Sequence, residues 1–168
     1  MAEEAWLSGK LEGFSPVMMP AAHALVQAKA DLRQCVLYLS IDELFERPGG
    51  AASVAFHLRH IAGSIDRLLT YSRGEELSER QFAELRAENS GETANAAELT
   101  QKAIAEIDNA LAELKTVAPE SLFEERFVGR KKLPTNVFGL LFHIAEHTAR
   151  HVGQVVTTAR IVQNKENG

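Results

Sequence analysis

The sequence predicts an all-α protein, a four-helix bundle. Apolar residues recur at helical spacing in four long segments, short breakers separate these segments, and no segment alternates convincingly like a strand. The 168 residues, of which 45% are hydrophobic and 24% charged, suit one domain with one sizeable core. We therefore expect a single four-helix domain over residues 1–168, with its core at about 15–162.

The first helix is expected from about Pro16 to Leu39. Proline is common at the first helical position, but Pro20 also removes a backbone donor, so the helix either begins or bends there. A single short helical turn should follow, because Ser40 and Glu43 have the spacing of a capping box.

The second long helix is expected from about Ser53 to Arg73, with Gly74 at the position where glycine often ends a helix. Its apolar residues recur at helical spacing. A shorter helix or turn is expected from Ser78 to about Glu88.

The third long helix should span about Asn95 to Val117, opened by a capping residue and closed before a proline. Residues 120–134 have mixed character and predict a long connection. The fourth helix follows from about Thr135 to Val162.

Five of the six histidines fall in two short clusters, His57 and His60 in the second helix and His143, His147 and His151 in the fourth. At about 100° per residue, His147 and His151 lie in the middle of the apolar stripe and His143 lies on its flank. Two histidines one turn apart can reach one metal ion, and a third ligand would then come from another helix. Periodicity mildly favours His57 over His60 for that role. Histidines that only pack and form hydrogen bonds are the alternative.

Charge and composition argue against several classes of protein. The net charge of −5 gives no basic footprint, so we expect no nucleic-acid partner. No apolar run approaches the roughly 18 to 20 residues of a membrane span, and the acidic N-terminal segment does not resemble a secretory signal. Cys35 is the single cysteine and is expected to fill the core. We expect a cytoplasmic protein.

Two motifs, HLRHIAGSIDRLLTY and later AEHTARHVGQ, resemble the DinB-like superfamily, also called the DinB/YfiT-like metalloenzymes. The family pattern is a histidine followed by Leu, Ile or Met and a small residue in the second helix, then HxxxH followed by x-Gly-Gln in the fourth. In this chain the pattern falls on His60-Ile61-Ala62 and on His147, His151 and Val152-Gly153-Gln154.

The resemblance covers most of the chain and implies an up-and-down-type four-helix bundle of the DinB/YfiT-like type, with a non-standard connection and frequent dimers. It also implies a divalent metal ion held by His60, His147 and His151. Imidazole ligands suit Zn, Ni, Cu or Fe, and of these we expect Zn or Ni. This set selects His60 where periodicity mildly favoured His57. In the family an Asp or Glu often stands at the position that Gly63 occupies here.

Three neutral imidazoles would leave a coordination position for water or substrate, as in catalytic zinc sites. The resemblance to thiol-dependent transferases and isomerases of the family implies a low-molecular-weight thiol as a further cofactor. We expect a metal-dependent enzyme that acts on a small-molecule substrate, either a thiol S-transferase or a related transferase or hydrolase. We also expect the protein to be a homodimer. The alternative is a non-catalytic metal-binding or stress-response interaction protein in which the ion braces two helices.

Overall fold

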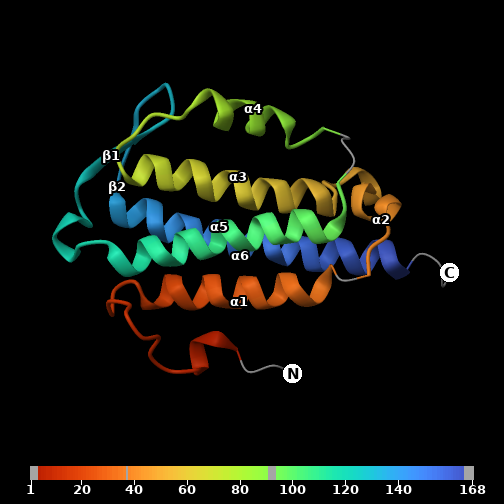
Figure 1. The fold of residues 1–168 in the computed structure, drawn as a ribbon, viewed down its shortest axis with the longest axis horizontal. Helices are drawn as coiled ribbons and strands as arrows, with labels where there is room; N and C mark the ends of the chain where they lie inside the picture. Colours follow the sequence, from red (N-terminus) through yellow and green to blue (C-terminus); the bar gives the residue numbers. More distant parts are fainter. Residues whose placement is uncertain (1–3, 37, 91–93, 165–168) are drawn as a thin grey trace.

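The computed structural model describes residues 4–36, 38–90 and 94–164. It confirms the expected fold class, because four long helices form a bundle: α1 (Met19–Cys35), α3 (Val54–Ser72), α5 (Ala96–Thr116) and α6 (Val137–Gln163) (Figure 1). Shorter elements are the helices α2 (Ile41–Phe45) and α4 (Glu79–Ala87), the 3-10 turns η1 (Ala5–Leu7), η2 (Pro48–Gly50) and η3 (Pro119–Ser121), and the strands β1 (Glu125–Val128) and β2 (Leu133–Asn136).

The helices do not alternate simply up and down. Helices α1 and α6 run in one direction, and α3 and α5 run in the other (Figure 1). Both α1 and α3 pack against α5 and α6, so α5 and α6 lie across a diagonal of the bundle. The histidine-bearing helices α3 and α6 are therefore antiparallel neighbours in direct contact.

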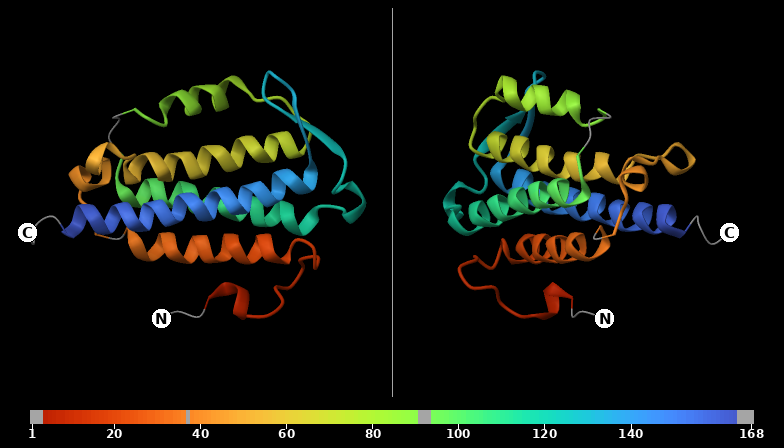
Figure 2. Two further views of the ribbon diagram at one scale, coloured as in Figure 1. Left: turned by 180° about the vertical axis from the view of Figure 1, so that it is seen from behind. Right: turned by 45° about the vertical axis from the view of Figure 1, so that its right-hand side comes forward.

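The connection between α3 and α5 is what makes these two helices parallel. Helix α4 lies in this connection and runs antiparallel to α3 (Figure 1). It packs on the outer side of α3, away from α1, in both views of Figure 2. The chain thus returns along α3 before α5 begins.

Local signals fixed most helix starts. Ser40, Ser78 and Asn95 each form the full capping box with the residue three positions later. Ser53 caps α3 by accepting a hydrogen bond from the Phe56 backbone N–H. Gly74 follows α3 with a φ of 77°, a conformation that glycine adopts at little cost.

Two expectations about the elements were wrong. Helix α1 begins at Met19, next to the alternative start at Pro20 and not at Pro16, but it ends at Cys35, before the expected Leu39. Residues 120–134 lie in the expected long connection, but no segment was expected to be a strand, and they contain β1 and begin β2, which pair as an antiparallel hairpin with Glu125 opposite Asn136. The strands have four residues each, too few to show a clear alternation.

The core lies between the four long helices and draws on each of them. Fully buried members include Leu25, Leu32, Leu58, Ile61, Ile65, Ile107, Leu141, Ile144 and Val155. In the part of the chain that the structure describes, none of the helices has both the length and the apolar character of a membrane span.

Candidate metal centre

Helix α6 presents two of the clustered histidines towards α3. The Asn136 side chain accepts a hydrogen bond from the Gly139 N–H at 2.7 Å and caps this helix. His147 and His151 stand one turn apart and are half-buried, whereas His143 is exposed. The prediction that His147 and His151 occupy the middle of the apolar stripe was wrong.

The buried face of α6 is wider than the periodicity indicated. Leu141, Ala145 and Val152 are also buried, because α6 packs against α1 as well as α3. The centre of the buried sector is therefore shifted, and the two histidines lie at its edge. At that edge their rings are packed on one side and remain reachable from solvent on the other.

Helix α3 supplies the second histidine cluster. His57 is almost fully buried, at 3% exposed, as its closeness to the apolar stripe predicted. His60 lies almost one turn further along and is half-buried. The two side chains therefore reach α6 at different depths.

The structure brings His60, His147 and His151 together. One ring nitrogen of each lies within 4.8 Å of the others, and no other such group of three or more His, Cys, Asp or Glu occurs among the described residues. The Nε2 atoms of His60 and His147 are 2.9 Å apart. Two nitrogens that ligate one tetrahedral zinc at about 2.0–2.1 Å lie about 3.3 Å apart. The pair of His60 and His147 thus fits one divalent ion with a shift of a few tenths of an ångström, and His151 offers its ring nitrogen within 4.8 Å of both.

His57 contacts the trio without belonging to it. Its Nδ1 lies 3.0 Å from Nδ1 of His151, at hydrogen-bond distance. The contact occupies one nitrogen of His151 and leaves its Nε2 for another partner. The structure therefore groups His60, not His57, with the histidines of α6, and the assignment of these three as metal ligands stays a prediction.

A residue that the sequence did not indicate completes the surroundings of His60. Nδ1 of His60 lies 2.8 Å from Oε2 of Glu88, which follows α4, and the other oxygen of Glu88 accepts a hydrogen bond from Arg67 at 2.7 Å. Glu88 and Arg67 are 6% and 8% exposed. No local pattern marks Glu88, because its partners lie on a different helix.

Comparisons with known proteins identify the family and the fold of the chain. Residues 24–155 match the sequence model of the DinB superfamily. The chain belongs to the DinB superfamily. No curated protein matches the chain in sequence. Among solved structures, it is similar to YfiT from Bacillus subtilis with a TM-score of 0.66 and 16% sequence identity, over 92% of this chain and 93% of that one. That protein is described as a probable metal-dependent hydrolase with an unusual four-helix bundle topology.

Burial keeps two histidines of this DinB-superfamily chain neutral. It lowers the pKa of His147 and of His151 to about 4, with a further contribution from His60 nearby. The pKa of His57 is lowered as well, first by burial and then by His60. At neutral pH these imidazole rings are therefore neutral, and each has one nitrogen with a lone pair that can bind a metal ion.

Glu88 is held in its charged form. Burial by itself raises the pKa of this carboxyl, but the hydrogen bonds from His60 and Arg67 outweigh it, so the pKa lies below its usual value. A carboxylate can only accept hydrogen bonds. His60 must then donate from Nδ1, so Nε2, the nitrogen that faces His147, is the one left to bind an ion.

Charged residues of α6 form an exposed rim beside the trio. Arg150 pairs with Glu146 at 2.9 Å, and Nη2 of Arg150 lies 3.4 Å from Nδ1 of His147. His143 pairs with the same Glu146 at 3.2 Å. Gln154, the last residue of the family motif, is exposed.

Cys35 and the cavity of about 800 Å³, two other places where a functional site could be sought, lie away from the histidine trio. Cys35 borders a cavity that residues of α1 and α6 line together with Tyr38 and that includes no histidine, and burial raises the pKa of its thiol to about 11. A cavity of about 800 Å³ lies between the end of α3 and the hairpin, where Tyr71, Phe82 and Arg126 line it. The histidine trio is not part of either cavity.

Proposed function

We propose that this chain is a divalent-metal-dependent enzyme in which His60, His147 and His151 hold the ion. The observation that carries the proposal is the convergence of three imidazoles from α3 and α6, with ligand atoms within 4.8 Å of one another. No carboxylate or thiolate of the described residues joins this group. Three neutral protein ligands are typical of catalytic rather than structural zinc sites.

The donor set fits several divalent metals. Imidazole ligands suit zinc, nickel, copper and iron, and of these we propose zinc or nickel as the physiological ion. A bound divalent ion would supply Lewis acidity and lower the pKa of a water or thiol bound at its open position. The protein's own residues hold the three ring nitrogens in place, and the 20% exposure of the His60 side chain leaves an approach from solvent.

The nucleophile is proposed to be a small molecule. Cys35 is the only cysteine, and a thiol with a pKa of about 11 is not a thiolate at neutral pH. Water would make the protein a hydrolase, which is how YfiT is described. A low-molecular-weight thiol would make it an S-transferase, as the resemblance to thiol-dependent members of the family implies. The two reactions differ in the nucleophile, and in both the same ion would activate it.

The first experiment tests the ion. Protein purified without an affinity tag is analysed for metal, beside His60→Ala and His147→Ala variants. We expect about one equivalent of zinc or nickel in the wild type and none in the two variants. Wild-type protein that neither contains nor takes up a divalent ion would overturn the proposal.

The second experiment distinguishes a catalytic ion from an ion that only stabilises the packing of α3 against α6. The metal-loaded protein is offered activated esters and amides, and electrophiles together with small thiols, with and without chelator. We expect turnover in one of the two panels that the chelator and His147→Ala abolish. An ion that raises the melting temperature and supports no turnover would indicate that it only braces α3 and α6.

A further inference from the structure

Glu88 is a buried carboxylate, and burying a charged group costs free energy. Carboxylates are almost never fully buried unless they are paired, because they lose their hydration. Glu88 is 6% exposed and has two partners, His60 and Arg67. Buried ion pairs add little net stability, since desolvation offsets their attraction. Stability alone therefore does not account for a charge at this position.

The two carboxylate oxygens are divided between the partners. Oε1 accepts from Nη2 of Arg67 at 2.7 Å, and Oε2 accepts from Nδ1 of His60 at 2.8 Å. The ring of Phe56 stacks on the His60 ring, with the centroids 5.4 Å apart and the planes 11° from parallel. The imidazole is thus fixed both at one nitrogen and across one face, while Nε2 points to the other histidines.

Gly63 provides the space for this arrangement. A Cβ atom built at Gly63 would lie 2.7 Å from Nη1 of Arg67 and 2.9 Å from Oε1 of Glu88. Both distances are shorter than a normal van der Waals contact. Any larger residue would push the guanidinium and the carboxylate away from α3, so the glycine is matched to the Glu88–Arg67 pair.

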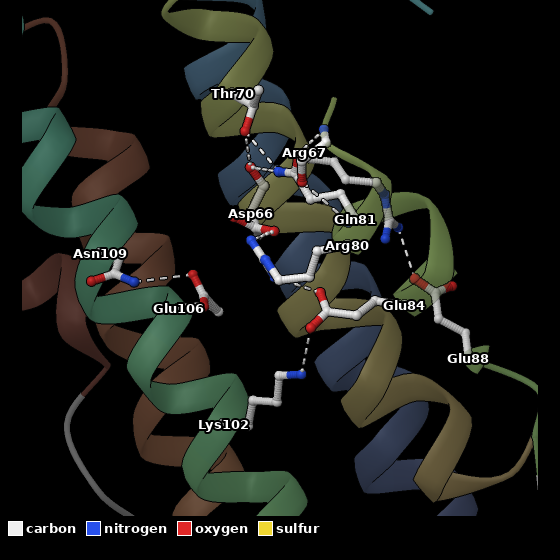
Figure 3. A network of polar contacts seen from close by, with 11 residues as sticks. Asp66, Arg67, Thr70, Arg80, Gln81, Glu84, Glu88, Lys102, Glu106 and Asn109 are labelled. Atoms are coloured by element: carbon white, nitrogen blue, oxygen red, sulfur yellow. Dashed lines mark hydrogen bonds and ion pairs between the residues drawn. The ribbon is translucent and has the colours of Figure 1, made fainter. Parts of the chain in front are cut away.

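A second polar anchor holds α4 along α3. Gln81, near the start of α4, donates to Thr70 at 2.8 Å, and Arg80 pairs with Asp66 at 3.0 Å (Figure 3). The same view shows Arg67 and Glu88 joined nearer the far end of α4. Helix α4 is therefore attached to α3 at both ends, and the attachment through Arg67 at its C-terminal end places Glu88 beside His60.

We propose that Glu88 is a positioning residue for the metal centre, delivered by α4. Its carboxylate keeps the proton of His60 on Nδ1 and the lone pair on Nε2, directed at the ion, while Arg67 orients the carboxylate and Gly63 leaves room for both. A carboxylate bonded to a ligand imidazole fixes the ring and makes it a stronger donor. The inference rests on the metal site of the proposed function.

The test compares zinc affinity in Glu88→Gln, Glu84→Gln and the wild type, by competition with a chromophoric chelator. Glu84 lies one turn before Glu88 on α4 and pairs with Arg80 and Lys102 away from the histidines, so its variant makes the same charge change. We expect Glu88→Gln to weaken zinc binding by about 10- to 100-fold. Glu84→Gln should stay within about twofold of the wild type, because solvent-exposed pairs contribute little.

Gly63→Ala is the second variant, because it displaces the pair without changing a charge. It should weaken zinc binding in the same direction while circular dichroism still shows a folded helical protein. In metal-free wild-type protein, long-range ¹⁵N–¹H spectra of the imidazoles should show His60 protonated at Nδ1, a state that packing alone does not require.

The outcomes distinguish the two proposals. Wild-type protein that binds no zinc would overturn the metal site and this inference together. Folded Glu88→Gln and Gly63→Ala proteins that bind zinc as tightly as a zinc-binding wild type would overturn the positioning role alone. His60 protonated at Nε2 in the wild type would also overturn it.

Discussion

At the scale of single residues, the burial of His147 and His151 makes stability depend on pH. Both have a pKa of about 4 in the folded protein and about 6.5 when exposed. Between these values the unfolded chain binds more protons than the folded one, so protons favour unfolding. We expect the free energy of unfolding of chelator-treated protein to be highest above pH 6.5 and to fall as the pH is lowered towards 4. Urea denaturation at pH 7, 6 and 5 measures this, and the dependence should be smaller in a His147→Ala, His151→Ala double variant.

His57 and His60 should differ sharply when each is replaced. His60→Ala removes a member of the trio and should abolish zinc binding. His57→Ala removes only the contact to His151, so one ion should still bind, about tenfold more weakly. Isothermal titration with zinc gives stoichiometry and affinity for both. Binding that survived His60→Ala and was lost in His57→Ala would assign the ligand of α3 to His57.

The sequence could indicate the trio only in part. The HxxxH spacing predicted that His147 and His151 share a face, because helix geometry decides it locally. The choice between His57 and His60 depends on how wide a sector α3 buries, which is set by its neighbours, and the family resemblance pointed to His60. Glu88 could not be found in this way, since 28 residues and a reversal of the chain separate it from His60.

At the scale of elements, Asn136 joins the hairpin to α6. It is the last residue of β2, and its side chain caps the helix that carries His147 and His151. Asn136→Ala should lower the free energy of unfolding by about 1 kcal/mol, because a first-turn N–H loses its partner. Urea denaturation measures the change, and the zinc affinity of the folded variant should be unchanged. Unaltered stability would show that the cap contributes nothing.

Helix starts were predictable where one side chain decides them. Ser40 and Asn95 cap as their sequence context indicated, and the helices expected from Ser53 and Ser78 begin with those residues as caps. The hairpin was missed because its four-residue strands are stabilised by pairing with each other, a contact that no single strand displays. The early end of α1 was missed because apolar residues continue at helical spacing to Leu39, beyond the last helical residue, Cys35.

At the scale of the whole molecule, an ion held by α3 and α6 as proposed would bind the folded chain more tightly than the unfolded chain, in which these histidines are far apart. Removing it should lower the melting temperature, and adding it should raise stability with the logarithm of its free concentration. At 100 times the dissociation constant the gain is about 2.7 kcal/mol. Thermal unfolding over a series of buffered zinc concentrations checks this. A melting temperature independent of zinc would contradict it.

The homodimer expected from the family resemblance remains a prediction about the assembly. Sedimentation equilibrium over a range of protein concentrations should give twice the mass of the chain. A constant monomer mass would contradict it. The bundle itself was predictable from four amphipathic segments, whereas the parallel arrangement of α3 and α5 was not, because it depends on the path of α4 across the outside of α3.

The order of the elements also sets when the centre can come into existence during synthesis. His60 precedes His147 by 87 residues, and α6 is the last helix of the bundle to leave the ribosome. Glu88, which we propose to position His60, emerges earlier, at the end of α4. Domains generally fold as units, and the three proposed ligands meet only when α6 packs against α3. Uptake of an ion by all three histidines would therefore report that the bundle has formed.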